Sequence, residues 1–347
     1  MRNGGIASGE RRAQAAGFDF DGLAIRVSGD WPEVQRALEL DLAWFGSGSA
    51  EVSGAVQVVI ERGAPELDSF GELPAAFVTP RNVVYQQRGR TIVEYFGRAV
   101  SVLDRKADRI VVRGDDEGLV HEAAYQFVLS RVGRHYDSLG WTRLHGLGLQ
   151  GGAGGVVVML PSGGGKTTLG LRAMREPGVR LISEDTPLLD RRGMLHPFVL
   201  RVGVNEADAE RLGVAGGRRL ERMEFRPKVA IEVETFADRI VAGPVPMSDL
   251  VIGRRTLGGT PRLEPMPRRS ALGSLLREGV VGVGVYQGME FVLQHGMRDT
   301  LGKAGVAASR AACCAAGLRR ARVWSFTLGR DEEGNWEALR GLLDRPG

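Results

Sequence analysis

One stretch of the sequence constrains the fold of this chain more than any other. It is an apolar run that ends in three glycines, a lysine and two threonines. The stretch is VVVMLPSGGGKTTLGLRAM, Val156 to Met174, and a helical pattern starts directly after the glycines. Consecutive glycines let the backbone curl so that several N–H groups point at one spot, and the following helix adds the positive end of its dipole. A strand, such a turn and a helix in this order predict a phosphate-binding loop in an α/β fold.

The predicted loop implies a nucleoside triphosphate as ligand. Its expected binding residues are Ser162, Gly163, Gly164, Gly165, Lys166, Thr167 and Thr168. Lys166 would reach the β- and γ-phosphates, and the Thr167 hydroxyl would take one position on Mg²⁺. The usual pattern is G-x-x-x-x-G-K-[ST], and this chain departs from it with Leu160 and Pro161 at its start. The alternative is a glycine-rich hairpin in which Lys166 is merely solvated.

Composition favours the phosphate-binding interpretation. Of the 46 basic residues only four are lysines, namely Lys106, Lys166, Lys228 and Lys303. The wide planar guanidinium of arginine cannot replace a compact ammonium inside a phosphate-binding loop. A lysine directly after the glycines of an arginine-rich chain therefore indicates such a loop. The same reasoning makes Lys228 a secondary candidate, with an ordinary surface lysine as the alternative.

The bulk properties predict a cytoplasmic protein of two domains. The chain has 347 residues and is 43% hydrophobic, and no apolar run approaches the ~20 residues that span a bilayer. The first residues lack the apolar region of a secretion signal, and Cys313 and Cys314 are neighbours that cannot pair well on a helix. The net charge of +4 is mild, so no nucleic acid and no membrane partner is expected.

The positions of Gly, Asp and Pro residues between the patterned segments suggest that the chain has three parts. These are a flexible tail over residues 1–16, an N-terminal α+β domain over 17–140 and a nucleotide-binding domain with a mixed sheet over 141–347. Short β-like runs between 18 and 114 predict an antiparallel sheet. Apolar spacing predicts helices at Trp31–Leu40 and from Glu117 to about Asp137.

Two further features are candidates for chemistry near the loop. The strand Val179–Ile182 ends in Ser183-Glu184-Asp185, and acids at the end of a strand beside a phosphate loop can hold Mg²⁺ or accept a proton. A solvated acidic turn is the alternative. His145 precedes Lys166 by a glycine-rich turn, so two short antiparallel strands could bring it to the phosphates, although a lone histidine in a strand is more often structural.

The segment Gly146–Gly151 also matches G-x-G-x-x-G, the dinucleotide fingerprint. It precedes a strand instead of opening a helix, so we interpret it as a turn.

Residues 144–190 resemble the catalytic core of HPr kinase/phosphorylase and of the related phosphoenolpyruvate carboxykinases. That family has a His-Gly pair, a strand pair, the loop G-D-S-G-x-G-K-S and then an Asp-Asp pair. The matching elements here are His145-Gly146, the loop from Leu160 to Thr167, and Glu184-Asp185. Thr168 is closer to the Lys-Thr-Thr of the carboxykinases. The runs PLLDRRGMLHPFVLRVGV and RVWSFTLGRDEEGN are more loosely similar to HPr-kinase-like proteins associated with peptide-modifying gene sets, including lasso-peptide kinases.

The resemblance implies a carboxykinase-like fold and a role for each matching residue. Lys166 and the glycines would bind ATP, Thr167 and Asp185 would serve Mg²⁺, Glu184 would be the general base, and His145 would assist near the phosphates. The family's second signature, a Leu-Leu-Glu-x-Arg-Gly-like element of the hexameric bifunctional enzymes, is not visible. Whether the reverse reaction occurs, and whether HPr is the substrate, therefore stays open.

Together these observations predict an ATP- and Mg²⁺-dependent kinase that phosphorylates a hydroxyl, with serine on a protein or peptide as the expected acceptor. Two alternatives stay open: a nucleotide-binding regulatory module without transfer, and a carboxykinase-like or small-molecule kinase. The N-terminal domain suits either substrate recognition or contacts in a homo-oligomer.

Overall fold

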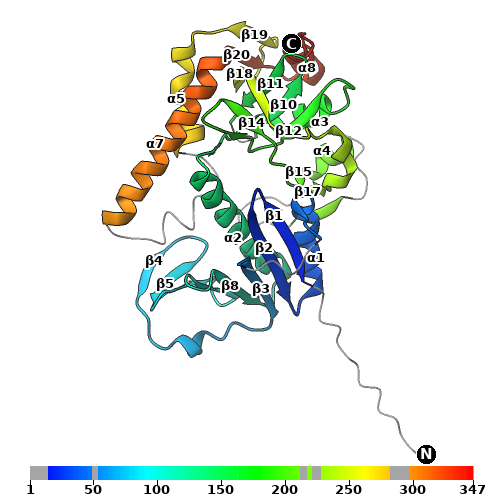
Figure 1. Ribbon diagram of the computed structural model, residues 1–347. Helices are drawn as coiled ribbons and strands as arrows, with labels where there is room; N and C mark the ends of the chain where they lie inside the picture. Colours follow the sequence, from blue (N-terminus) through cyan, green and yellow to red (C-terminus); the bar gives the residue numbers. More distant parts are fainter. Residues whose placement is uncertain are drawn as a thin grey trace, which may run out of the picture. The chain divides into compact units, whose positions relative to one another are not determined.

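The computed structural model has both helices and mixed sheets, and it is an α/β protein (Figure 1). It describes residues 15–48, 54–161, 163–211, 217–220, 228–281 and 297–346. Contacts divide the chain into two compact units, Met1–Val128 and Leu129–Gly347, and the division lies inside helix α2 (Glu117–Ser138). Of the tail expected over residues 1–16, residues 1–14 lie outside the described part, whereas Ala16 already begins a strand.

The N-terminal unit is built on an eight-stranded sheet in the order β1-β2-β3-β8-β7-β6-β5-β4. Helix α1 (Pro32–Asp41) and the start of α2 confirm the two predicted helices. The strands are β1 (Ala16–Phe20), β2 (Leu23–Gly29), β3 (Val56–Arg62), β4 (Ala75–Val78), β5 (Val83–Gln87), β6 (Arg90–Glu94), β7 (Ala99–Asp104) and β8 (Arg109–Gly114).

The expectation of a purely antiparallel N-terminal sheet is wrong. Strand β3 pairs in parallel with both β2 and β8, while the other pairings are antiparallel. The reason is the connection between β2 and β3. Helix α1 lies between them in sequence, and a helical crossover returns the chain parallel to its starting strand, whereas a tight turn would reverse it.

Close packing of α2 on this sheet is allowed by a glycine. A Cβ on Gly114 would lie 2.9 Å from Cγ2 of Val120 on α2 and from Cβ of Ala99 on β7. The two helices are joined by a buried pair, in which His121 Nε2 lies 2.7 Å from Asp41 Oδ2.

The C-terminal unit contains a nine-stranded sheet with the path β12-β10-β11-β18-β14-β13-β9, and β20 and β19 extend it from β18. Its strands are β9 (Thr142–Arg143), β10 (Leu147–Gly151), β11 (Gly154–Met159), β12 (Arg180–Ser183), β13 (Leu188–Leu189), β14 (Met194–His196), β18 (Val245–Arg255), β19 (Arg262–Pro265) and β20 (Arg322–Leu328). A three-stranded sheet, β15-β17-β16, comprises β15 (Val202–Val204), β16 (Arg218–Leu220) and β17 (Lys228–Ile231).

Strand β10 corrects one expectation. Gly146–Gly151 was expected to be a turn, but Leu147–Gly151 pairs antiparallel with β11 on one side and β12 on the other. The dinucleotide fingerprint is not supported, because these glycines serve close packing in a sheet and open no helix. A Cβ on Gly148, for example, would lie 3.0 Å from Cβ of Pro187.

The helices of the C-terminal unit are α3 (Lys166–Ala173), α4 (Glu206–Arg211), α5 (Leu272–Leu275), α7 (Met297–Arg320) and α8 (Glu332–Leu343). Helix α7 contributes the buried, free Cys313 and Cys314 to a core that also contains Val157 and Leu250. Burial raises the pKa of Cys313 to about 11 and that of Cys314 to about 12, so neither is a thiolate near neutral pH. Among the described residues, no helix has the length and apolar character needed to cross a bilayer.

Candidate functional site

The glycine loop (residues 160–165) joins β11 to α3, as the sequence predicts for this strand, turn and helix. Strand β11 is fully buried along its length and lies inside the sheet, with β10 antiparallel on one side and β18 parallel on the other. Gly163 and Gly165 take left-handed conformations, with φ of 72° and 101°, which L side chains rarely adopt. A Cβ on Gly164 would lie 2.8 Å from the carbonyl oxygen of Pro161, so the middle glycine is required by space. Ser162 lies outside the described residues.

The departure at Leu160 has a packing explanation. Its side chain is 3% exposed and lies over Gly253 of the neighbouring β18, where an added Cβ would approach Leu160 Cδ2 to 2.3 Å. Leu160 therefore uses its side chain in the core, and its backbone carbonyl accepts a hydrogen bond from Lys166 Nζ at 3.0 Å. Leucine thus replaces the first glycine of the usual phosphate-loop pattern, and Lys166 still contacts the loop.

Lys166 is buried at the N-terminus of α3 and contacts His145. The side chain is 8% exposed, and its Nζ lies 3.1 Å from His145 Nε2 and 3.7 Å from Asp185 Oδ1. His145 lies directly before β10, whose pairing with β11 carries the histidine back beside the loop. The structure thus brings together three predicted site residues that are up to 40 positions apart in the sequence.

The acidic pair follows β12 and its two members contact different partners. Thr167 Oγ1 donates a hydrogen bond to Glu184 Oε1, whereas Asp185 Oδ1 lies 3.3 Å from His145 Nε2. Thr168 follows in the first turn of α3. The family resemblance assigns Thr167 and Asp185 together to Mg²⁺, whereas in the structure the hydrogen-bond partner of Thr167 is Glu184.

The pKa values of the two carboxyls are shifted in opposite directions. Burial, together with the negative charge of Asp185, raises the pKa of Glu184 to about 7. Burial also opposes ionisation of Asp185, whose side chain is nevertheless 45% exposed, and the hydrogen bond and charge of His145 outweigh it and lower the pKa of Asp185. Glu184 is thus a carboxyl that can change protonation near neutral pH, and Asp185 is an ionised one.

The pKa of His145 is raised chiefly by its hydrogen bond to Asp185, against the opposing effect of burial. Its Nδ1 lies 2.9 Å from Glu278 Oε2. In the neutral ring, Nδ1–H donates to Glu278 and Nε2 accepts from Lys166. In the protonated ring, Nε2–H donates to Asp185 instead. His145 can therefore adjust to charge at either neighbour.

Lys228 joins this cluster from the smaller sheet. It begins β17, and its positive charge favours the ionised form of both acids, although burial and the charge of Asp185 outweigh this effect on the pKa of Glu184. Two of the four lysines in the chain therefore act on the same two acids. The sequence made Lys228 a secondary candidate, and that role stays a prediction; the sequence did not place it beside the acids.

Two residues near the site were missed by sequence reasoning. Glu278, which holds His145, lies 133 positions away in an irregular helical segment, and no local pattern identifies it. Arg255 ends β18, and its Nη1 is 3.4 Å from where a Cβ on Gly165 would be. A signal for Arg255 did exist, because an arginine pair closes a strand parallel to β11, and ligands of such sheets bind at the carboxyl ends of strands.

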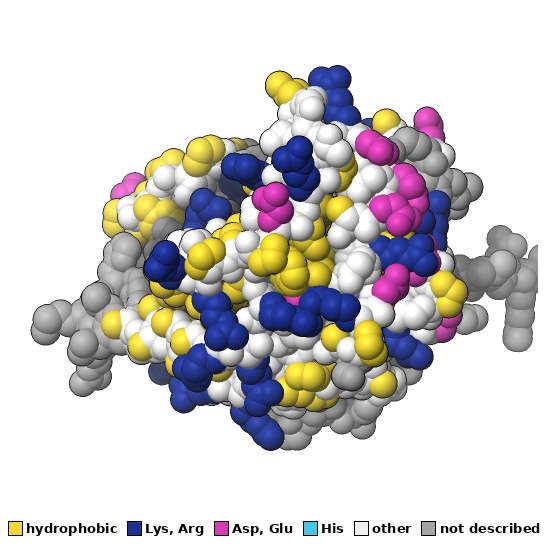
Figure 2. All heavy atoms as spheres, turned by 90° about the horizontal axis from the view of Figure 1, so that it is seen from above, with side chains coloured by type: hydrophobic (Ala, Val, Ile, Leu, Met, Phe, Trp, Pro, Cys, Tyr) yellow, Lys and Arg dark blue, Asp and Glu magenta, His cyan; other side chains and the backbone are white. Residues whose placement is uncertain are grey.

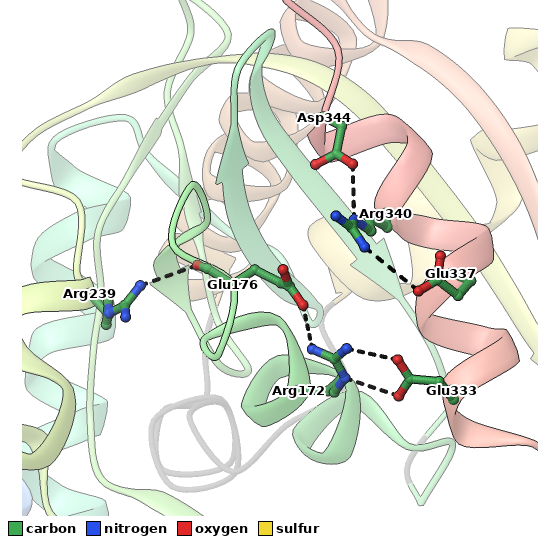
Figure 3. A network of polar contacts seen from close by, with 7 residues as sticks. All are labelled: Arg172, Glu176, Arg239, Glu333, Glu337, Arg340 and Asp344. Atoms are coloured by element: carbon green, nitrogen blue, oxygen red, sulfur yellow. Dashed lines mark hydrogen bonds and ion pairs between the residues drawn. The ribbon is translucent and has the colours of Figure 1, made fainter.

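Helix α3 is fixed at its far end by an ionic cluster (Figure 3). Arg172 donates to both oxygens of Glu333 on α8, at 3.1 and 2.7 Å, and to Glu176 at 2.6 Å. The guanidinium also lies over the Trp336 ring, 5.1 Å from its centroid. Glu333 and then Glu176 raise the pKa of Arg172, which therefore stays charged, and this cluster anchors the helix that carries Lys166 and Thr167.

Exposed arginines gather at the end of the unit where β18 and β19 meet the surface. They are Arg254, Arg255 and Arg262, because Arg255 and Arg262 pair with Leu328 and Thr327 at the end of β20. In the view of Figure 2, dark blue Lys and Arg side chains predominate over magenta acidic ones. This surface favours a negatively charged ligand near Arg255.

The donor set at the loop suits Mg²⁺ bound together with phosphates. Thr167, Glu184 and Asp185 supply oxygen atoms, the ligands that Mg²⁺ prefers. The part of the chain that the structure describes contains no group of three or more His, Cys, Asp or Glu side chains that could hold a metal unaided. Magnesium in such sites usually keeps waters and is bound by one or two carboxylates and the substrate phosphates, which these residues can provide.

Comparison with protein-family models and with curated proteins finds no match to this chain.

Proposed function

We propose that this protein is an ATP- and Mg²⁺-dependent kinase that transfers the γ-phosphate to a hydroxyl, with a serine of a protein or peptide as the acceptor. The observation that carries the proposal is the convergence of Lys166, Thr167, Glu184, Asp185 and His145 on one glycine loop. Nothing in the packing of a hairpin requires a buried lysine and two acids at the same point.

The glycine loop and its cations would bind the triphosphate. The N–H groups at the start of α3 and the helix dipole attract phosphate oxygens, Lys166 balances the charge of the γ-phosphate, and Arg255 is placed to add a second cation. Thr167 would hold Mg²⁺ together with a carboxylate, and the bound ion would neutralise charge on the phosphate oxygens.

In the transfer step, the acceptor hydroxyl oxygen forms a bond to the γ-phosphorus, and the bond from that phosphorus to the β–γ bridging oxygen breaks. ADP leaves with the electron pair of the broken bond. The hydroxyl proton passes to Glu184. Its Oε1 accepts the Thr167 hydrogen bond, so Oε2 receives the proton. A pKa of about 7 suits a base that must be ionised before the reaction and protonated after it.

The hydrogen bond from Thr167 to Glu184 favours the opposite assignment, in which Glu184 binds the metal and Asp185 is the base. Because Thr167 donates to Glu184, these two oxygens could share the metal, leaving Asp185 beside His145 as the base. The pH dependence of transfer distinguishes the two. With Glu184 as base, the rate rises as pH passes about 7, whereas with Asp185 as base the rise occurs at lower pH, since the pKa of Asp185 is lowered.

The test is transfer of label from γ-phosphate-labelled ATP to a library of serine-containing peptides, with serine-to-alanine copies as negative controls. We expect labelling that requires Mg²⁺ and serine, and that is lost in Lys166→Ala. Lys106→Ala is the matched control, since Lys106 is an exposed lysine of the N-terminal unit. Binding of ATP with no transfer to peptides or small hydroxyl compounds would favour a regulatory module. Labelling of small hydroxyl compounds alone would favour a small-molecule kinase.

A further inference from the structure

The N-terminal unit contains an open hollow of about 1060 Å³. One wall is the segment from Leu67 to Pro74, and the floor includes Tyr85 and Ile92, which face each other across β5 and β6. The hollow is at the upper end of the size range of small-ligand pockets.

Phe96 lines the hollow, and both its exposure and its backbone conformation are unfavourable. It is 55% exposed, and its backbone has φ of 52°, a left-handed conformation unusual for a bulky residue. The reason is the tight turn between β6 and β7, where Phe96 and Gly97 both have positive φ and Arg98 N–H bonds to the Tyr95 carbonyl. Asn, Asp or Gly is favoured at such a position, so an exposed phenylalanine costs stability that a binding role would explain.

The polar lining of the hollow is acidic. Asp68, Glu72 and Glu94 contribute to it, and Lys or Arg contributes none, in a chain with 46 basic and 42 acidic residues. Among the described residues, the carboxylates of Asp68 and Glu72 form no ion pair or hydrogen bond. Two arginines close in sequence to lining residues or their neighbours form ion pairs with other acids: Arg98 with Asp116, and Arg113 with Glu66. The hollow is therefore complementary to a cation that also has apolar surface.

The hollow adjoins a sheet edge that offers backbone hydrogen bonds. Strand β4, drawn in cyan in Figure 1, ends the sheet, and its sequence AAFV contains no charged residue of the kind that usually protects an edge. Pro74 of the wall directly precedes it, and Tyr85 of the floor pairs with its Ala75. Val78 is 66% exposed. No strand of the described chain pairs with the outer edge of β4.

We propose that the N-terminal unit binds an extended peptide as an added strand on β4. In this arrangement an apolar side chain passes over β4 into the hollow, whose apolar lining includes Tyr85 and Phe96, and an Arg or Lys two residues away meets Asp68 and Glu72. Residues two apart on a strand lie on the same face, so one peptide can supply both contacts. The proposal needs no phosphoryl transfer and therefore stands apart from the proposed function.

The test measures fluorescence anisotropy of dye-labelled peptides with the full chain and no nucleotide. Peptides of about six residues, the length of an ordinary strand, carry Leu and Arg two positions apart in a Ser/Thr background. A second pool has Glu in place of Arg, and a third has Pro at two central positions so that the backbone cannot pair. We expect the Arg pool to bind at least about tenfold more tightly than either other pool, and more weakly as salt is raised.

Phe96→Asn and Arg88→Asn form a matched pair of variants. Both residues precede a glycine in turns with two positive φ values, so asparagine relieves strain equally, but only Phe96 lines the hollow. We expect Phe96→Asn to keep or raise the melting temperature and to weaken binding of the Arg pool about tenfold or more. Arg88→Asn should leave binding unchanged.

Three results would overturn the proposal: equal binding of the Arg and Glu pools, equal binding of the Pro pool, or full binding by Phe96→Asn. Absence of binding by every pool would also overturn it. So would a dimer of this chain that covers β4 and is lost in Phe96→Asn, because the edge would then serve self-association.

Discussion

Replacing Glu184 by glutamine should stabilise the protein at high pH and have no such effect at low pH. The pKa of this carboxyl rises from an ordinary 4.5 to about 7 in the folded protein. Below 4.5 it is protonated in both the folded and the unfolded state. As pH rises from there to about 7, the unfolded chain loses the proton first, so stability falls, and above about 7 the full cost is present.

The size of this effect follows from the shift. One pKa unit is 1.36 kcal/mol, so a shift from 4.5 to about 7 corresponds to a cost of about 3 kcal/mol for the ionised, half-buried carboxylate. Glutamine carries no charge and retains the Oε1 that accepts the Thr167 hydrogen bond. The variant should therefore unfold with a free energy up to about 3 kcal/mol larger than wild type at about pH 8.

The assay is urea-induced unfolding of wild type and Glu184→Gln across this pH range, in the absence of nucleotide and Mg²⁺. Asp185→Asn is the control of opposite sign, because a carboxyl with a lowered pKa contributes stability that is present at neutral pH and lost on acidification. A stability difference between wild type and Glu184→Gln that does not change with pH would refute the reasoning.

Three other variants test separate parts of the structure. Arg310→Ala should cost about 3–5 kcal/mol of unfolding free energy, because the buried Arg310 makes two hydrogen bonds to Asp137, at 2.8 and 2.7 Å. An unfolding midpoint equal to that of wild type would contradict this. Gly253→Val should cost about 1–3 kcal/mol, since its side chain would overlap Leu160; retained stability would mean that the strand accommodates it. Arg255→Gln should keep the melting temperature, because Arg255 is exposed, and lower kcat about a hundredfold in the transfer assay. Unchanged kcat would remove Arg255 from the site.

The parts of the fold that depend on local sequence were predictable. The strand, glycine turn and helix around Lys166 follow from one continuous pattern, and so do α1, α2 and strands such as β18 and β20. The parallel pairing of β3 was missed because pairing direction depends on which strands become neighbours, and short β-like runs contain no such information. Short, mostly exposed β4 was missed because its AAFV sequence lacks alternation.

The candidate site shows the same division. Glu184, Asp185 and His145 were found because strands lead directly into or out of them, so their position relative to the loop follows from the order of elements. Glu278 was not found from the sequence, because it is 133 positions from His145 and only the tertiary fold brings the two into contact. The hollow beside Phe96 was also invisible, because a tight turn in a strand pattern predicts Asn or Gly and gives no reason to examine a phenylalanine.

Thermal unfolding with and without Mg²⁺-ATP tests the central claim most directly. Wild type, Lys166→Ala and the control Lys106→Ala are compared. At about 100 times the dissociation constant, ATP should stabilise wild type and the control by about 2.7 kcal/mol, and the stabilisation should need Mg²⁺ and vanish in Lys166→Ala. Absence of any stabilisation in wild type, or equal stabilisation in Lys166→Ala, would contradict a nucleotide site at the glycine loop.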